Sequence, residues 1–283
     1  MGQELINRNA SGQGVLWSAK ALFDHPEAVQ AVHEDYIQAG ADIITTNSYA
    51  CIRNNFEPEG LLDRLGEMNR LAAQLAQRAR DKSGRQVLIA GSMGPQYGSY
   101  RPDLVQSYAK TEALYREQAE FLAPHVDLFI CETLSCITEA RAAVSAAMST
   151  GIPVWLSWSI ADSGAANLRS GEPIAEAWAD IADSGIRAVL LNCSPPEAIT
   201  RALPALVSLS TVPVGAYANA FTPIPDKWDF HGDESIPPPR TDVTPRAYSE
   251  YAAAWRKAGA SIIGGCCEVG PAHIAALHQT LRG

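Results

Sequence analysis

The chain has 283 residues, 47% of them apolar and 19% charged, and a formal net charge of −9. The acidic balance without a basic stripe argues against a nucleic-acid partner, and the lack of an apolar run of about 18–20 residues argues against a membrane span. Because no secretory signal is visible, we expect a cytoplasmic protein that keeps its six cysteines reduced. Its partners are expected to be small-molecule substrates.

Seven short apolar runs are expected to be strands. They are continuously apolar and β-branched rather than alternating, which is typical of parallel strands that are buried on both faces. In chain order they cover residues 42–47, 87–92, 127–132, 154–160, 188–192, 212–217 and 261–264.

Helical segments separate these runs, and several carry end signals. Gly40, Gly84 and Gly259 follow helices, and Pro271 opens one. The expected helices cover residues 27–39, 61–82, 104–122, 137–149, 174–183, 196–209, 245–258 and 271–281.

The alternation of strands and helices predicts right-handed βαβ units and an α/β fold with a parallel sheet. No Gly-rich phosphate-binding fingerprint follows an early strand, which favours a closed (β/α)8 TIM barrel over a doubly wound sheet. We expect one barrel domain over residues 1–283. The expected helices outnumber the expected strands because the chain opens at a helix. The first strand of the barrel is therefore expected to be missing or truncated at the N-terminus.

A long Pro-rich segment, residues 218–244, follows a predicted strand at the face where barrel enzymes carry their catalytic groups. A loop of this length is usually functional or mobile, and a solvated excursion is the alternative. It contains His231, the one histidine that its position does not exclude from a catalytic role.

Three cysteines lie where two predicted strands end. Cys193 follows the strand 188–192, and Cys266 and Cys267 follow the strand 261–264 after a Gly-Gly pair. Because these strands flank one other strand, their carboxyl ends meet on one rim and the three thiols can converge. Three soft sulfur ligands suit Zn2+ and leave a fourth tetrahedral position open.

An open site of three thiolates favours alkyl transfer to sulfur. The thiolates make zinc a poor Lewis acid for water, yet zinc still lowers the pKa of an added thiol, which binds as the nucleophilic thiolate. A metal-free cysteine nucleophile would need a neighbouring base, and no histidine ends a predicted strand. The other cysteines, Cys51, Cys131 and Cys136, are interpreted as buried core residues.

Several short sequence motifs, taken as a set, resemble those of a known family. They are LWSAK (16–20), ITTNSY (44–49), AGSMGP (90–95), CET (131–133), LNC (191–193) and IGGCC (263–267). In this set, which spans essentially the whole chain, the sequence resembles the homocysteine S-methyltransferase family. The last two strings are the most specific. The resemblance implies a zinc barrel in which the three strand-end cysteines hold the metal.

The resemblance also implies roles for residues around the metal. Glu132 matches an acid that holds the homocysteine amino group, and a carboxylate facing an ammonium group suits that role. Asn192 would bond the amino acid or orient the site, and Thr46 and Tyr49 match pocket-lining positions. Trp17 matches an aromatic residue near the methyl donor, where a ring face suits a cation.

Four further positions follow from the resemblance. Ser92 and Met93 are expected in the substrate pocket. Tyr217 and Asn219 are similar to the family's tyrosine and asparagine after the seventh strand, although Ala218 replaces the proline expected between them.

The N-terminus departs from the family pattern. The family begins with a strand that ends in Asp-Gly-Gly/Ala-Met-Gly, and this chain starts at what resembles that Met-Gly, Met1-Gly2. We therefore expect the natural chain to begin upstream of Met1. The 283-residue form would then be poorly active, less stable, or dependent on another segment.

The expected reaction is zinc-dependent methyl transfer from a sulfonium donor, S-methylmethionine, to homocysteine, which gives methionine. Betaine, S-adenosylmethionine or dimethylsulfoniopropionate as donor, and selenocysteine as acceptor, remain open alternatives. An N-terminally truncated, non-catalytic zinc-binding barrel is the alternative from another functional class. The sequence does not determine the oligomeric state.

Overall fold

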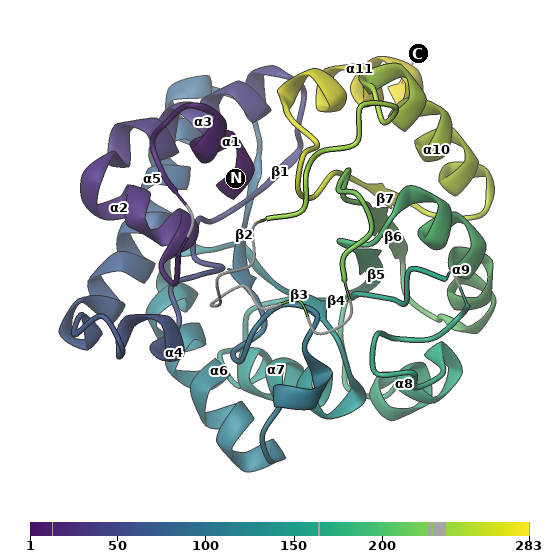
Figure 1. Cartoon of the computed structure of the whole chain (residues 1–283), viewed down its shortest axis with the longest axis horizontal. Helices are drawn as coiled ribbons and strands as arrows, with labels where there is room; N and C mark the ends of the chain where they lie inside the picture. The colour runs from purple at the N-terminus through teal and green to yellow at the C-terminus, as the bar shows by residue number, and fades with distance from the viewer. Residues whose placement is uncertain (13, 164, 226–227, 229–235, 283) are drawn as a thin grey trace.

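The computed structural model describes residues 1–12, 14–163, 165–225, 228 and 236–282. In these residues seven parallel strands form one curled sheet in chain order, with helices around it (Figure 1). The α/β architecture and the seven strands confirm the expectation of a barrel-like fold that lacks its first strand. The strands are β1 (Ile43–Thr45), β2 (Leu88–Met93), β3 (Leu128–Leu134), β4 (Val154–Trp158), β5 (Ala188–Asn192), β6 (Val214–Tyr217) and β7 (Ile262–Ile263).

The eight expected helices are present, and the described residues form three short α-helices in addition, α1, α2 and α4. These three are too short to show a helical period in the sequence. The helices are α1 (Gly2–Asn7), α2 (Lys20–Asp24), α3 (Pro26–Gln38), α4 (Arg53–Phe56), α5 (Leu65–Ser83), α6 (Tyr108–Leu122), α7 (Ile137–Met148), α8 (Ile174–Ile181), α9 (Pro196–Leu209), α10 (Pro245–Lys257) and α11 (Pro271–Arg282).

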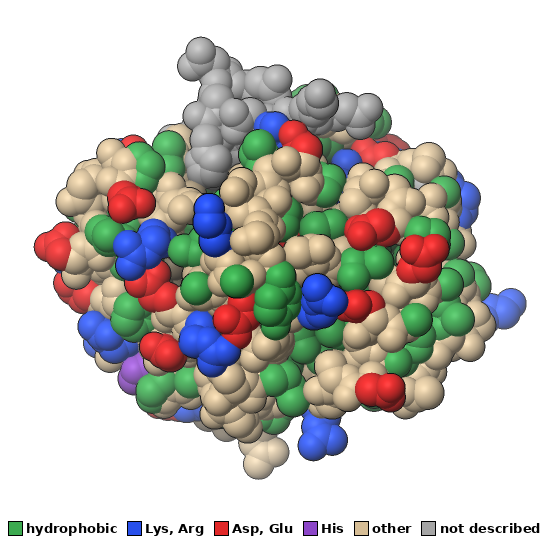
Figure 2. All heavy atoms as spheres, turned by 90° about the horizontal axis from the view of Figure 1, so that it is seen from below, with side chains coloured by type: hydrophobic (Ala, Val, Ile, Leu, Met, Phe, Trp, Pro, Cys, Tyr) green, Lys and Arg blue, Asp and Glu red, His purple; other side chains and the backbone are tan. Residues whose placement is uncertain are grey.

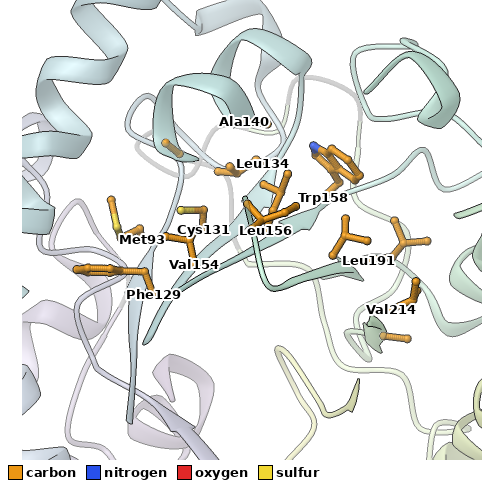
Figure 3. Close-up of a cluster of buried hydrophobic side chains, with 14 of the residues drawn as sticks. Met93, Phe129, Cys131, Leu134, Ala140, Val154, Leu156, Trp158, Leu191 and Val214 are labelled. Atoms are coloured by element: carbon orange, nitrogen blue, oxygen red, sulfur yellow. The ribbon is translucent and has the colours of Figure 1, made fainter. Parts of the chain in front are cut away.

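The strands β3, β5 and β6 are buried along their whole length, which explains their largely apolar sequences, whereas the edge strands β1 and β7 are partly exposed. The face toward the helices forms the large core, where Phe129, Leu156 and Leu191 pack together (Figure 3). The face toward the barrel axis forms a smaller cluster that includes Ile130 and Leu190. Side chains therefore alternate between the two cores along each strand, and this alternation decides which residues can reach the barrel interior.

The strand layer is open between β1 and β7, which each pair with a single neighbour among the described residues. Both strands are shorter than expected because only one edge of each carries a hydrogen-bonded ladder. The helix layer is closed at the same place, since α3 contacts α11 and Arg282 donates to Asp42 at 2.5 Å. Gly40, with a φ of +106°, permits this closure, because a Cβ there would lie 2.6 Å from the His278 ring.

The surface mixes charges of both signs. On the face drawn in Figure 2, acidic and basic side chains are interspersed among apolar ones. None of the helices in the described residues combines the length and the apolar character that crossing a bilayer requires.

Candidate metal and substrate site

The three strand-end thiols meet at one rim of the sheet. Cys193 follows β5, Cys266 and Cys267 follow β7, and the strand between them is β6. The Sγ atom of Cys193 lies 2.8 Å from that of Cys266 and 3.9 Å from that of Cys267. All three sulfur atoms lie within 4.8 Å of one another, so this group could hold a metal ion.

The backbone around the thiols adopts uncommon conformations. Cys193 and Glu268 have φ angles of +47° and +63°, in the left-handed region that non-glycine residues seldom adopt. Such residues cost of order 1–3 kcal/mol each and cluster at functional sites. Gly265 is also required, because a Cβ there would lie 2.1 Å from the Val269 side chain. The chain thus accepts local strain to turn the two adjacent cysteines toward Cys193.

The thiols of the cluster differ electrostatically from the other cysteines. Burial alone would raise the pKa of the Cys193 thiol, but hydrogen bonds from Cys266, Cys267 and Tyr100 outweigh it and hold that pKa well below its usual value. The same sharing with Cys193 raises the pKa values of Cys266 and Cys267.

The remaining cysteines behave as core residues. Burial raises the pKa of Cys136 to about 12 and those of Cys51 and Cys131 further. In Figure 3 Cys131 lies among apolar side chains between the sheet and the helices.

Glu132 in β3 is a buried carboxylate that faces the same cavity as the thiols. Its Oε1 accepts from Ser92 Oγ at 2.5 Å and its Oε2 accepts from Tyr217 Oη at 3.1 Å. Burial raises the pKa of the Glu132 carboxyl, and these two hydrogen bonds partly oppose the rise. The arrangement holds an anionic group with free lone pairs at the cavity wall, where it could receive a cationic amino group.

Asn192 occupies a fully buried position at the end of β5. Its Oδ1 accepts from the Thr133 backbone N at 2.9 Å and from Ser157 Oγ at 2.7 Å, and its Nδ2 donates to Thr133 Oγ1 at 2.8 Å. These bonds hold Thr133 at a φ of +64°, directly after Glu132. The amide oxygen and nitrogen of Asn192 are both engaged by neighbouring protein groups.

The expected aromatic residues lie together at the cavity wall. The rings of Trp17 and Tyr49 are 5.9 Å apart in an edge-to-face arrangement, and the Tyr49 hydroxyl shares a 2.7 Å hydrogen bond with Ser99 Oγ. Thr46 lies nearby, and its Oγ1 accepts from the Ser92 backbone N at 3.1 Å. All but Ser99 were expected in the pocket from the sequence.

Ser92 and Met93 point to opposite sides of β2. Ser92 lines the cavity and holds Glu132, as described above. Met93 is fully buried in the core between the sheet and the helices, beside Cys131 (Figure 3). The alternation of side chains along the strand explains the difference, and Met93 lies away from the cavity lining.

Two further tyrosines contribute to the site. Tyr217 ends β6 and donates to Glu132, and Asn219 Nδ2 lies 4.0 Å from Cys193 Sγ. Tyr100, which lies in the loop after β2, places its hydroxyl 2.9 Å from Cys193 Sγ. No motif or spacing in the sequence pointed to Tyr100, because a loop residue has no strand register that fixes its direction.

Described residues of the segment 218–244 lie against the thiols. Phe221, Ile224 and Trp228 pack with Tyr100 and Cys193 in a small apolar cluster. His231 falls outside the described residues.

One cavity of about 790 Å³ joins these features. It is lined by the three thiols, by Glu132 and by the aromatic rings, and it continues to Ile43 of β1 and Ile262 of β7 at the opening of the sheet. His33 also lines it, and the buried Nε2 of that residue has no hydrogen-bond partner among the described residues.

Comparisons with known proteins agree with this geometry. A family model described as homocysteine S-methyltransferase matches residues 1–281. The homocysteine S-methyltransferase of Escherichia coli (strain K12) is 33% identical over 299 residues, which cover 98% of this chain and 92% of that protein. A selenocysteine methyltransferase of Astragalus bisulcatus is 31% identical over 318 residues, with 99% and 90% covered.

A solved structure matches the fold of this chain over the whole length of the chain. The crystal structure of the homocysteine methyltransferase MmuM from Escherichia coli, in its metallated form, superposes with a TM-score of 0.84 at 30% identity. The match covers 100% of this chain and 94% of that chain.

Proposed function

The chain belongs to the homocysteine S-methyltransferase family, and from that premise we propose that it methylates homocysteine to methionine at a zinc ion held by Cys193, Cys266 and Cys267. The observation that carries the proposal is the convergence of three thiols and one buried carboxylate on a single cavity. The thiols would bind a soft metal ion that accepts a soft sulfur nucleophile, and the carboxylate would bind the ammonium group of an amino acid.

The residues present fit a zinc ion. Three soft sulfur atoms within 4.8 Å of one another are a donor set that zinc prefers. Zinc–sulfur bonds of about 2.3 Å give a tetrahedron an edge of about 3.8 Å; the Cys193–Cys267 separation of 3.9 Å matches that edge, and the Cys193–Cys266 separation of 2.8 Å would widen toward it on binding. Three protein ligands leave the fourth position for a substrate sulfur. When bound, zinc supplies a Lewis acid that lowers the pKa of the homocysteine thiol, so that its sulfur is a thiolate at neutral pH.

Glu132 orients the amino acid in this proposal. Its carboxylate, fixed by Ser92 and Tyr217, receives the ammonium group of homocysteine and thereby sets where the sulfur lies. Thr133 and Asn192 hold the backbone of this wall in place. The protein thus contributes alignment rather than a proton-transfer group, because attack of a thiolate on an activated methyl group needs no base.

The aromatic rings suit a cationic methyl donor. Trp17 and Tyr49 present π-electron density to the cavity, and a sulfonium such as that of S-methylmethionine is attracted to such faces. Their position supports S-methylmethionine as the donor. Betaine, S-adenosylmethionine and dimethylsulfoniopropionate also carry a cationic ammonium or sulfonium centre, so they belong in the same donor screen.

Selenocysteine is a second candidate acceptor. The observation that favours it is the similarity to a selenocysteine methyltransferase at 31% identity over nearly the whole chain. A selenolate is a soft nucleophile like a thiolate, and its amino group would meet the same carboxylate.

Metal content and methionine formation test the proposal together. Protein purified without chelators should contain about one zinc per chain, and Cys266→Ala should lose both the zinc and the activity. Cys131→Ala is the matched control, because Cys131 is a buried core cysteine and its replacement should leave both unchanged. Zinc-free wild-type protein, or a Cys266→Ala variant that forms methionine at the wild-type rate with S-methylmethionine, would refute it.

A further inference from the structure

Tyr100 makes the one hydroxyl contact to the thiol cluster among the described residues. Its Oη lies 2.9 Å from Cys193 Sγ. A thiolate has no proton to give, so when Cys193 is ionised Tyr100 must be the donor of this hydrogen bond. The side chain is nearly fully buried, so the bond is shielded from water.

The surroundings of Tyr100 fix its ring in place. Tyr100 has a φ of +65°, an unfavourable backbone conformation for a residue with a side chain. The Arg169 guanidinium lies 4.6 Å from the ring centroid, and the centroid of the Trp228 ring lies 6.0 Å from it. Arg169 itself is held by Asp162 Oδ1 at 2.5 Å and by Ser159 Oγ at 3.1 Å. The hydroxyl is thus aimed at the sulfur by a rigid set of contacts.

A methyl donor in this cavity meets more than one nucleophilic sulfur. Cys193 lines the same cavity as the Trp17 and Tyr49 rings, and its Sγ is the sulfur that approaches both of the others. Methylation of Cys193 would form a bond from its sulfur to the methyl carbon and break the bond from that carbon to the donor sulfur. The donor would leave as a neutral sulfide with the electron pair, and the protein would be left with a thioether.

A hydrogen bond to a thiolate lowers its nucleophilicity, because it stabilises the charge that would have to leave the sulfur in the attack. We propose that Tyr100 is a positioning residue that suppresses methylation of Cys193 and so directs the methyl group to the substrate sulfur. This role rests on the proposed function, because it matters only if a methyl donor binds in the cavity. The change in sulfur reactivity follows from the Tyr100 contact alone.

Alkylation with methyl iodide tests the inference without any assumption about the natural donor. The thiolate displaces iodide, which leaves with the electron pair, and the methyl group adds to the sulfur. Wild type, Tyr100→Phe and a control, Tyr97→Phe, are treated in the absence of homocysteine, and the Cys193 peptide is followed by mass spectrometry. Tyr97 lies in the same loop, and its hydroxyl contacts Thr111 Oγ1 at 3.4 Å rather than a sulfur.

We expect Cys193 to be methylated about tenfold faster or more in Tyr100→Phe than in wild type, as the loss of a hydrogen bond to a charged group implies. Tyr97→Phe should match wild type, and both variants should melt as wild type does. Bound zinc, measured with a chromogenic chelator, should be lost in step with Cys193 methylation.

Equal rates of Cys193 methylation in wild type and Tyr100→Phe, or methylation confined to Cys266 and Cys267 in both, would overturn the inference. Failure of the proposed function has a different signature, the lack of zinc in wild type. Because a bound ion also changes the reactivity of Cys193, the two alkylation rates are compared both in protein as purified and in protein stripped of metal with a chelator. The comparison in stripped protein depends on the hydrogen bond alone and is read in either case.

Discussion

Replacing Glu132 by Gln removes one charge from the cavity and keeps the size of the side chain. The carboxylate is buried, and its two hydrogen bonds from Ser92 and Tyr217 leave lone pairs for an ammonium group. A hydrogen bond to a charged group in such a setting contributes about 1.5–3 kcal/mol. The KM for homocysteine should therefore rise about ten- to a hundredfold.

The assay is methionine formation against homocysteine concentration at saturating donor, with zinc content measured in the same samples. Zinc should stay near the wild-type level because Glu132 is outside the sulfur group. Glu139→Gln is the control, since Glu139 is another buried carboxylate but bonds to Ser135 away from the cavity lining. An unchanged KM for homocysteine in Glu132→Gln would refute the proposed contact.

The same contact predicts a pH dependence. Burial raises the pKa of the Glu132 carboxyl, so the group becomes neutral at a higher pH than an exposed glutamate does. The KM for homocysteine should therefore rise as the pH falls through this raised pKa. In Glu132→Gln that rise should be absent, and its persistence would assign the titration to another group.

Two further predictions concern stability. Burial raises the pKa of Glu139 to about 7, so folding favours the protonated carboxyl. The free energy of unfolding should therefore fall, by of order 3 kcal/mol, as the pH rises from about 4.5 to 7. Denaturant titrations should show that Glu139→Gln lacks this fall, and parallel pH profiles of the variant and wild type would contradict the assignment. Adding an N-terminal extension that encodes a short apolar strand ending in Asp-Gly should raise the melting temperature and lower the KM for homocysteine, because it would pair the free edges of β1 and β7. Equal melting temperature and KM in both forms would show that the opening does not receive that strand.

The sequence was sufficient to predict the sheet and the convergence of three thiols because both depend on simple regularities. Parallel strands that follow one another place their carboxyl ends on one rim, so Cys193 and the Cys266–Cys267 pair could be brought together without coordinates. Glu132 was expected in the site from the family resemblance, and its place at the end of a strand agrees with the cavity position that the structure shows. The short lengths of β1 and β7 were not predictable, because they depend on which edges find a partner and not on apolar character.

Other features of the site depend on the direction in which a side chain points and not on its position along the chain. Ser92 and Met93 were expected together in the pocket, yet adjacent strand residues point to opposite faces, and only Ser92 reaches the cavity. Asn192 adjoins a thiol in sequence, but its amide is used by Thr133 and Ser157. Tyr100 reaches Cys193 from a loop whose course depends on contacts with Arg169 and Trp228. No periodic pattern encodes such a contact.

The open sheet also links ion binding by the three thiols to the local opening of the edge strand β7. Two of the three thiols follow β7, a strand of two residues that pairs only with β6 in the described part of the chain, and edge strands of this kind open more readily than strands paired on both sides. An ion shared by Cys193 and Cys267 would tie the end of β7 to the end of β5 across β6. Thermodynamic linkage then works in both directions: whatever orders the edge of β7 strengthens ion binding, and ion binding protects the β7 amides from hydrogen exchange by the same factor.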